Sequence, residues 1–207
     1  MEPVVRFLRA NRWARRGLSL LSAGLLVAAV AMLGYPFYTN FYANRTQDRL
    51  ERQMASPDLA ESYRERKLQD GDALTRIKIP ALGVDTVVVE GTSASALRAG
   101  AGHYPDTPLP CETGNVAIAG HRTTYGKPFA NVDRLKSGDE IILETPVGSC
   151  VYKVRAAPTI HSPRDWSVIA NDPSKSELTL TSCHPKGSAA KRIVIKADLV
   201  GSGSEPT

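Results

Sequence analysis

The 207-residue sequence has few cysteines and no pair of them spaced as in a zinc site. Cys111, Cys150 and Cys183 are 39 and 33 residues apart, and no C-x2-C pair occurs. Structural zinc sites typically use such pairs, so we expect no metal site from these cysteines and no cofactor. Internal repeats are also absent, and low complexity is limited to a short Gly-Ser segment from Gly201. The length indicates one domain with appendages.

Beyond its first 16 residues the chain has almost no net charge. The whole chain carries 26 Lys and Arg against 21 Asp and Glu. Five of the basic residues and one of the acidic ones lie in residues 1–16, which leaves 21 against 20 for the rest. The body therefore lacks the basic surface that is typical of nucleic-acid binding, and we expect no nucleic-acid partner.

Charge is absent altogether from residues 17–38. A helix of 22 residues at ~1.5 Å per residue spans a hydrocarbon core of ~30 Å. Arginines precede this run, and aromatic residues such as Tyr35, Phe37 and Tyr38 lie at its far end, where the interface favours them. The positive-inside rule then predicts a cytoplasmic tail (1–16), a transmembrane anchor (17–38) and an extracellular body, as in a single-pass protein of the plasma membrane.

Two other interpretations of this apolar run compete with the membrane anchor. A buried core helix would have a polar face, and this segment has none. A cleaved signal peptide is the closer rival, because Ala29-Val30-Ala31 resembles a small-x-small cleavage site. The apolar run continues past that site to Tyr38, which favours a retained anchor.

The remaining chain divides by composition into three parts. Residues 39–73 are rich in Arg, Glu, Gln and Asp and predict an exposed extracellular stalk, partly helical at 47–54 and broken at Ser56-Pro57. Residues 74–200 form one domain, the body of the protein, and residues 201–207 a flexible tail. In the body, short segments rich in Val, Ile, Thr and Leu predict strands at 75–79, 85–90, 115–119, 140–145, 150–156, 177–181 and 192–198. Short helices fit 93–98, 129–135 and 165–169, and the whole pattern indicates a mostly β barrel or sandwich.

The end of one predicted strand offers a nucleophile. Cys183 follows the run 178–182 and precedes His184-Pro185, so it lies at the rim of the sheet. If the strands around it form a hairpin, Arg192 returns to the same edge. A thiol needs a base or a cation to become a good nucleophile. Among four histidines, His121 also closes a strand, whereas His184 points to the opposite face from its neighbour Cys183.

These residues together resemble the sortase signature of a Thr-Leu-x-Thr-Cys segment, a downstream arginine and a histidine at a strand end. Thr179-Leu-Thr-Ser-Cys183, Arg192 and Ala119-Gly-His121-Arg carry the resemblance. Further matching segments extend it over residues 74–199: Ile77-Lys-Ile-Pro80, Gly102-His-Tyr-Pro105, Gly114-Asn115 and Tyr125-Gly-Lys-Pro-Phe129. One departure is Ser182, where the family more often has threonine; both residues carry a hydroxyl.

The resemblance implies a closed eight-stranded β-barrel and a cysteine transpeptidase. Cys183 would cleave the Thr-Gly bond of a C-terminal sorting signal, with His121 as acid and base and Arg192 stabilising the oxyanion or the substrate backbone. Thr181 and Ser182 of the signature would contribute to substrate binding. The implied partners are secreted proteins that carry the signal and a cell-wall precursor with a free amine.

Within the family, the N-terminal anchor and Cys183-His-Pro resemble the class E enzymes of high-GC Gram-positive bacteria. Those enzymes act on Leu-Ala-x-Thr-Gly rather than Leu-Pro-x-Thr-Gly signals, and Tyr104 matches the tyrosine associated with this preference. The alternative interpretation is that Tyr104 is simply an aromatic side chain packed at the rim of the sheet. The pilus-building class usually carries a C-terminal membrane segment and a lid sequence, and neither is recognisable here.

Some alternatives stay open at the level of sequence. Cys111 and Cys150 form a disulfide, which an exported protein permits, or remain two thiols, of which Cys150 suits burial. The function has two rivals: a hydrolytic cysteine peptidase on the same scaffold, and a catalytically idle membrane-tethered binding module. The binding module leaves Cys183, His121 and Arg192 unexplained as a group.

Overall fold

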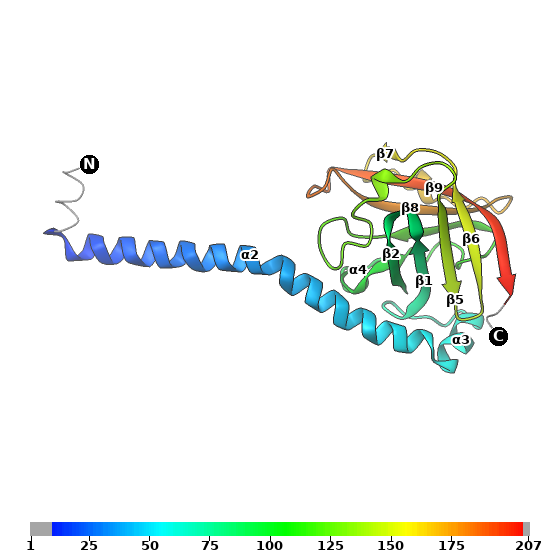
Figure 1. Cartoon of the computed structure of the whole chain (residues 1–207), viewed down its shortest axis with the longest axis horizontal. Coiled ribbons are helices and arrows are strands. Elements are labelled where there is room, and N and C mark those ends of the chain that lie inside the picture. Colours follow the sequence, from blue (N-terminus) through cyan, green and yellow to red (C-terminus); the bar gives the residue numbers. More distant parts are fainter. Residues whose placement is uncertain (1–9, 205–207) are drawn as a thin grey trace. The chain divides into compact units, whose positions relative to one another are not determined.

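The computed structural model describes residues 10–204, which divide into two units at Thr39 and Asn40. Helix α2 (Arg12–Met54) belongs to both units. Figure 1 shows this helix and the β-rich body that follows it. Arg6 and Arg9 of the predicted basic tail and residues 205–207 of the predicted flexible tail lie outside the described residues.

The first unit is the apolar part of α2. Among residues 10–204, α2 is the one helix long and apolar enough to cross a membrane. The predicted anchor, residues 17–38, lies within it. Its large side chains are exposed, including Leu20, Met32 and Phe37. Such a surface is suited to hydrocarbon rather than to water, as expected of a single-pass anchor.

The second unit is a closed β-barrel of eight strands with a ninth strand at one edge. The strands are β1 (Ala73–Ile79), β2 (Val84–Glu90), β3 (Ala101–His103), β4 (Gly114–Ala119), β5 (Glu140–Thr145), β6 (Gly148–Val154), β7 (Thr159–His161), β8 (Ser176–His184) and β9 (Lys191–Ser204). They follow the order β6-β5-β1-β2-β3-β4-β8-β9-β7, and a further pairing of β6 with β9 closes the ring. The predicted eight-stranded barrel is confirmed.

The barrel closes through the length of β9. Its first half pairs with β8 and with the edge strand β7, and its second half pairs with β6 from Ala197 to Ser204. Residues 201–204, predicted as part of a flexible tail, are therefore strand residues. The prediction was wrong because Gly and Ser have low strand propensity, whereas here their backbone groups complete the ladder to β6.

The predicted strands all occur, and the two that composition missed are short. β3 and β7 have three residues each, too few to show an alternating pattern. The predicted short helices correspond to α4 (Ala94–Ala99), η2 (Val132–Arg134) and η3 (Trp166–Ile169); a further short helix, η1 (Pro80–Leu82), joins β1 to β2.

Alternating side chains fill the barrel. On β6, Cys150, Tyr152 and Val154 are buried, as the sequence pattern predicts. On β8, Leu178 and Leu180 point into the same core, and Ile193 and Ile195 of β9 join them. The odd-numbered residues of β8, such as Thr179 and Cys183, consequently point to the outer face of the barrel.

The predicted stalk is wrong for much of its length. From residue 43, α2 places Ala43 and Leu50 against the barrel, and α3 (Pro57–Arg64) adds Leu59 and Tyr63. Apolar residues are sparse in this segment, but Ala43, Leu50 and Met54 fall on one helical face. A stripe of this kind is enough to pack a helix, although the average composition is polar.

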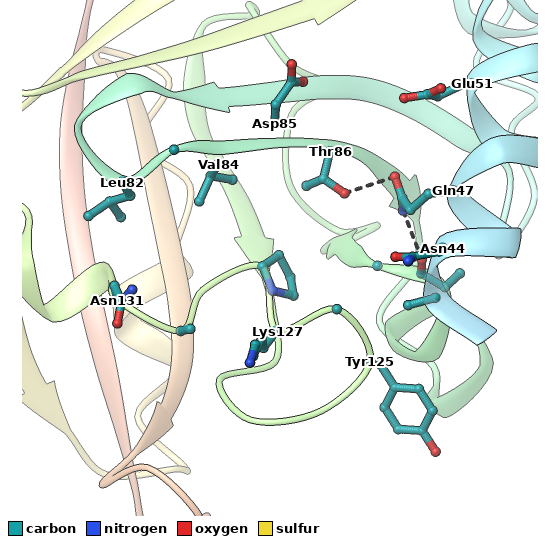
Figure 2. A pocket seen from close by; sticks show the side chains of 17 residues that line it. Asn44, Gln47, Glu51, Leu82, Val84, Asp85, Thr86, Tyr125, Lys127 and Asn131 are labelled. Carbon is teal, nitrogen blue, oxygen red and sulfur yellow. Dashed lines mark hydrogen bonds between the residues drawn. The ribbon is translucent and has the colours of Figure 1, made fainter. Parts of the chain in front are cut away.

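Gln47 reinforces this packing with four hydrogen bonds. Its Nε2 donates to the carbonyl oxygens of Val87 at 3.1 Å and Ala99 at 2.9 Å. Its Oε1 accepts from the Val87 N–H at 2.8 Å and from the Thr86 hydroxyl at 2.9 Å, and Figure 2 shows the Thr86 bond. One side chain thereby satisfies both the β2 backbone and the end of α4.

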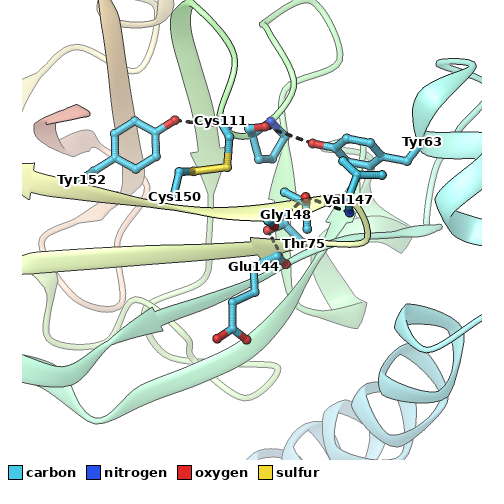
Figure 3. Close-up of a disulfide and its surroundings, with 10 residues drawn as sticks. Tyr63, Thr75, Cys111, Glu144, Val147, Gly148, Cys150 and Tyr152 are labelled. Carbon is cyan, nitrogen blue, oxygen red and sulfur yellow. Dashed lines mark hydrogen bonds between the residues drawn. A yellow bond between two sulfur atoms is a disulfide. The ribbon is translucent and has the colours of Figure 1, made fainter. Parts of the chain in front are cut away.

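A disulfide joins Cys111 to Cys150 (Figure 3), so of the two alternatives for these cysteines the structure has the disulfide. The Cα atoms are 5.6 Å apart, within the ordinary range of disulfides. The Cys111 N–H donates to the Tyr152 hydroxyl at 3.3 Å, and the Tyr63 hydroxyl donates to Pro110 O at 3.0 Å. The bridge and these bonds tie the loop before β4 to β6 and α3.

Removing the disulfide should destabilise the folded protein. The bridge closes a loop of 39 residues, and constraining such a loop in the unfolded chain is worth about 4 kcal/mol. We expect the double variant Cys111→Ser/Cys150→Ser to lose about 3–4 kcal/mol of unfolding free energy in urea denaturation. Cys183→Ser is the control with little expected effect; an unchanged denaturation midpoint in the double variant contradicts the prediction.

Candidate active site

The pairing of β8 with β9 brings Cys183 and Arg192 together. They are paired positions in the antiparallel ladder, so their side chains share the outer face. The Arg192 Nη1 donates toward the Cys183 Sγ at 3.7 Å, and it also bonds the carbonyl oxygens of Ala189 and Lys191, each at 3.2 Å. Cys183 is the free cysteine of the described chain and is half-buried. This contact puts a fixed positive charge beside the sulfur.

On the other side of β8, strand β4 leads to His121. The two strands are parallel, with Ala119 opposite Thr181, and the Gly120 N–H donates to Thr181 O at 3.1 Å. The ladder ends at Ala119, two residues before His121, so β4 leads the chain to His121 at the same end of the sheet as Cys183. The ends of β4, β8 and β9 thus bring His121, Cys183 and Arg192 to one edge of the barrel, a row of three neighbouring segments that the sequence separates widely.

Two contacts hold His121 at the end of β4. The Phe129 N–H donates to His121 O at 3.1 Å, which closes the loop that follows. The Phe129 ring packs on Gly120, where a Cβ atom would lie 2.5 Å from a ring carbon. Glycine before His121 is thus required by close packing.

Burial lowers the pKa of His121 below its usual value, because the charged imidazolium is poorly solvated there. The ring of Tyr125 contributes to this cover, with its centroid 5.5 Å from that of His121. The neutral imidazole is consequently the favoured form near neutral pH. A histidine in this form can accept a proton from an incoming amine.

Tyr104 and Thr181 meet on the same outer face. The Tyr104 hydroxyl and the Thr181 Oγ1 are 3.1 Å apart. Thr181 precedes Cys183 by two positions on β8, so both side chains point outward. The loop after β3 thus brings its tyrosine over the strand that carries the thiol.

Ser182 does not share this face. It is 4% exposed, and its hydroxyl donates to Gly120 O at 2.5 Å. Successive strand residues point to opposite sides, so the Ser182 side chain, predicted to bind substrate, faces away from the side chain of Cys183. Its hydroxyl instead holds β8 to the end of β4.

The other three histidines have different surroundings. His103 is fully buried between Glu90 and Pro108 O, each at 2.9 Å from a ring nitrogen. His161 lies on β7 opposite Arg192, with its Nδ1 2.8 Å from Asp165. His184 directs its Nδ1 to Arg122 at 3.3 Å. Of the four, His121 is the one that follows β4 at the end of the sheet that carries Cys183.

Arg122 belongs to the site region but was not singled out from the sequence. Its side chain is 3% exposed and reaches the strand end that carries Cys183. Arginine is rarely buried to this degree without a specific partner. Its position directly after His121 was the available signal, although sequence alone does not tell a buried arginine from an exposed one.

A cavity of about 380 Å³ adjoins the loop that follows His121. Figure 2 shows its walls: Tyr125, Lys127 and Asn131 of that loop face Gln47 and Glu51 of α2 and Asp85 of β2. Glu51 and Asp85 both pair with Arg76, so each acidic group on this wall already has a basic partner. Elsewhere in residues 10–204, no group of three His, Cys, Asp or Glu residues is placed to hold a metal ion.

Comparison with known proteins identifies the family. A profile described as "Sortase domain" matches residues 77–200. Sortase D of Bacillus subtilis is 34% identical over 143 residues, covering 68% of this chain and 70% of that protein. Sortase SrtE2 of Streptomyces coelicolor is 30% identical over 216 residues, covering 93% and 85% respectively.

Solved structures show the same architecture. Sortase E from Streptomyces avermitilis has a TM-score of 0.61 and 32% identity, covering 66% of this chain and 93% of its own. A sortase D5 transpeptidase from Clostridium perfringens has a TM-score of 0.67 and 28% identity, covering 77% and 99%. The chain belongs to the sortase family of cysteine transpeptidases, and the class E resemblance agrees with its Streptomyces relatives.

Opening the cover over His121 should raise its pKa. In Tyr125→Ala, water reaches the imidazole, and the pKa is expected to rise toward the ordinary value of about 6.5. The protonated fraction just below that pH therefore increases. An NMR titration of the His121 ring measures the change, with Tyr125→Phe as the control that keeps the ring. Identical titration curves in Tyr125→Ala and the parent contradict this account.

Proposed function

We propose that this protein is a membrane-anchored sortase that attaches exported proteins to the cell wall. The row formed by His121, Cys183 and Arg192 carries the proposal, above all the 3.7 Å contact between the Arg192 Nη1 and the Cys183 Sγ. The apolar segment of α2 supplies the anchor, with residues 1–16 in the cytoplasm and the barrel outside. Its donors are secreted proteins that end in a sorting signal.

The reaction divides into two acyl transfers. The Cys183 thiolate attacks the threonine carbonyl of the Thr-Gly bond, and the C–N bond breaks as protonated His121 delivers its proton to the leaving amine. The product is a thioester between Cys183 and the threonine. Arg192 donates hydrogen bonds to the oxyanion, which its fixed charge and planar fork suit, or to the substrate backbone.

The second transfer releases the thiol. The amine of a cell-wall precursor attacks the thioester, neutral His121 accepts the amine proton, and the thiolate of Cys183 leaves. The lowered pKa of His121 suits this acceptor role, and it also means that the imidazolium needed for the first transfer is a minor form near neutral pH. Water in place of the amine gives hydrolysis, which is the second candidate function.

Transfer and hydrolysis are separated by their products. The full chain in detergent micelles is incubated with a signal peptide, with and without an added amine, and the products are identified by mass spectrometry. We expect an amide product with the amine and free acid without it. Free acid alone in both reactions rules out transpeptidation, while formation of neither supports an idle binding module.

The role of each residue follows from variants in the same assay. Cys183→Ala should abolish turnover, and Arg192→Met should lower kcat by about 10²- to 10³-fold, the loss typical of one oxyanion donor. His121→Gln removes the group that carries the proton, and its kcat should also fall by at least about 10²-fold. Undiminished activity of Cys183→Ala overturns the proposed function.

The contact of Tyr104 with Thr181 supports a preference for Leu-Ala-x-Thr-Gly over Leu-Pro-x-Thr-Gly signals. The pair occupies the outer face beside Cys183, and class E resemblance associates this tyrosine with alanine. In Tyr104→Phe, loss of one neutral hydrogen bond of about 1 kcal/mol should reduce the Leu-Ala preference about fivefold. Rates on both peptides test this, with Tyr38→Phe as control; equal rates on the two peptides in the parent remove the class E specificity.

A further inference from the structure

The most unusual side chain near the site is Arg122. Its guanidinium is 3% exposed and faces a single carboxylate, Asp133, at 2.6 Å from Nη2. Nη2 also lies 3.4 Å from Ala130 O. Its Nε is buried without a hydrogen-bond partner among the described residues, which is costly in a folded protein. Packing alone does not explain why the positive charge of Arg122 is buried with so few partners.

The other arm of the fork reaches the strand end that carries the thiol. Nη1 lies 3.4 Å from Cys183 O and 3.3 Å from His184 Nδ1. One amino group has two protons, so it can donate to both acceptors at once. Arg122 thereby bonds two neighbouring residues at the end of β8, Cys183 through its carbonyl oxygen and His184 through its ring.

The same contact determines the tautomer of His184. A guanidinium N–H is a donor only, so the Nδ1 that faces it must be the acceptor, and the ring proton then lies on Nε2. In this tautomer the Nδ1 lone pair accepts from the Arg122 N–H, and Nε2 carries the ring proton. The hydrogen bond to Arg122 thus occupies the basic nitrogen of His184, the immediate neighbour of the nucleophile.

We propose that Arg122 is a positioning residue that connects the His121 loop to the Cys183 strand end and blocks His184 as a rival base. Arg122 follows His121 directly in the chain, so its backbone belongs to the loop that carries the proposed acid and base. Its side chain bonds the strand end that carries the proposed nucleophile, Cys183. Asp133 and Ala130 O anchor the other arm of its fork on the same loop. This inference rests on the roles proposed above for Cys183 and His121.

The tautomer is tested on the unaltered protein, independently of any folding defect. With ¹⁵N-labelled histidine and assignment of the His184 ring, NMR should show an unprotonated Nδ1 and a protonated Nε2 at neutral pH. A proton on Nδ1 overturns the proposal.

The positioning role is tested with Arg122→Lys, which keeps the charge but replaces the planar fork by a single donor centre. We expect kcat to fall about 10- to 100-fold with KM changed less than about twofold, because bound peptide is retained while the reacting groups are misaligned. The His184 ring should also lose its single tautomer. Arg134→Lys, the same change on the exposed η2 helix, is the matched control and should leave both readouts unchanged.

The outcomes separate this inference from the proposed function. If Cys183→Ala abolishes turnover but Arg122→Lys matches the parent in kcat and in the His184 spectrum, the positioning role alone is wrong. If KM rises in proportion to any loss of kcat/KM while kcat is unchanged, Arg122 serves binding instead and the proposal is again wrong. If Arg122→Lys does not fold, the tautomer of His184 in the unaltered protein decides whether the proposal holds.

Discussion

The double pairing of β8 is the constraint on which the rest of the site depends. This strand is hydrogen-bonded to β4 in parallel and to β9 in antiparallel fashion. The first register leads the chain to His121 at the strand end that carries Cys183, and the second places Arg192 opposite Cys183. Strand spacing is fixed by backbone hydrogen bonds, so a rigid ladder sets the separations that catalysis needs. A one-residue slip of either pairing would turn Cys183 toward the core.

The electrostatics of the site follow from this placement. Arg192 lies on the outer face with the thiol, whereas Arg122 is buried and bonds the same strand end through Cys183 O. Burial holds His121 toward its neutral form by lowering its pKa. The chain thus combines two fixed positive charges near Cys183 with one histidine whose proton can move. A two-step acyl transfer uses both, because fixed charge stabilises an oxyanion and a mobile proton serves the leaving and the incoming amine.

The support for this site extends well beyond the strands that carry it. The Cys111–Cys150 disulfide and the Tyr63 bond to Pro110 hold the loop between β3 and β4, in which Tyr104 also lies. Gln47 fastens the second half of α2 to β2 and α4. Residues that composition assigns to a solvated spacer therefore belong to the catalytic body. Their contribution is mechanical, because none of them lies in the row of His121, Cys183 and Arg192.

Much of this was predictable from sequence because it depends on near neighbours. Apolar continuity at 17–38, the alternation at Cys150, Tyr152 and Val154, and the signature around Cys183 are local patterns, and they predicted the helix, the strands and the family. The tertiary structure alone decided that the Ser182 hydroxyl bonds Gly120 O, that Arg122 bonds Cys183 O and His184, that Ala43 and Leu50 pack on the barrel, and that residues 201–204 pair with β6. These facts depend on register and barrel closure between segments distant in the chain, which local composition does not encode.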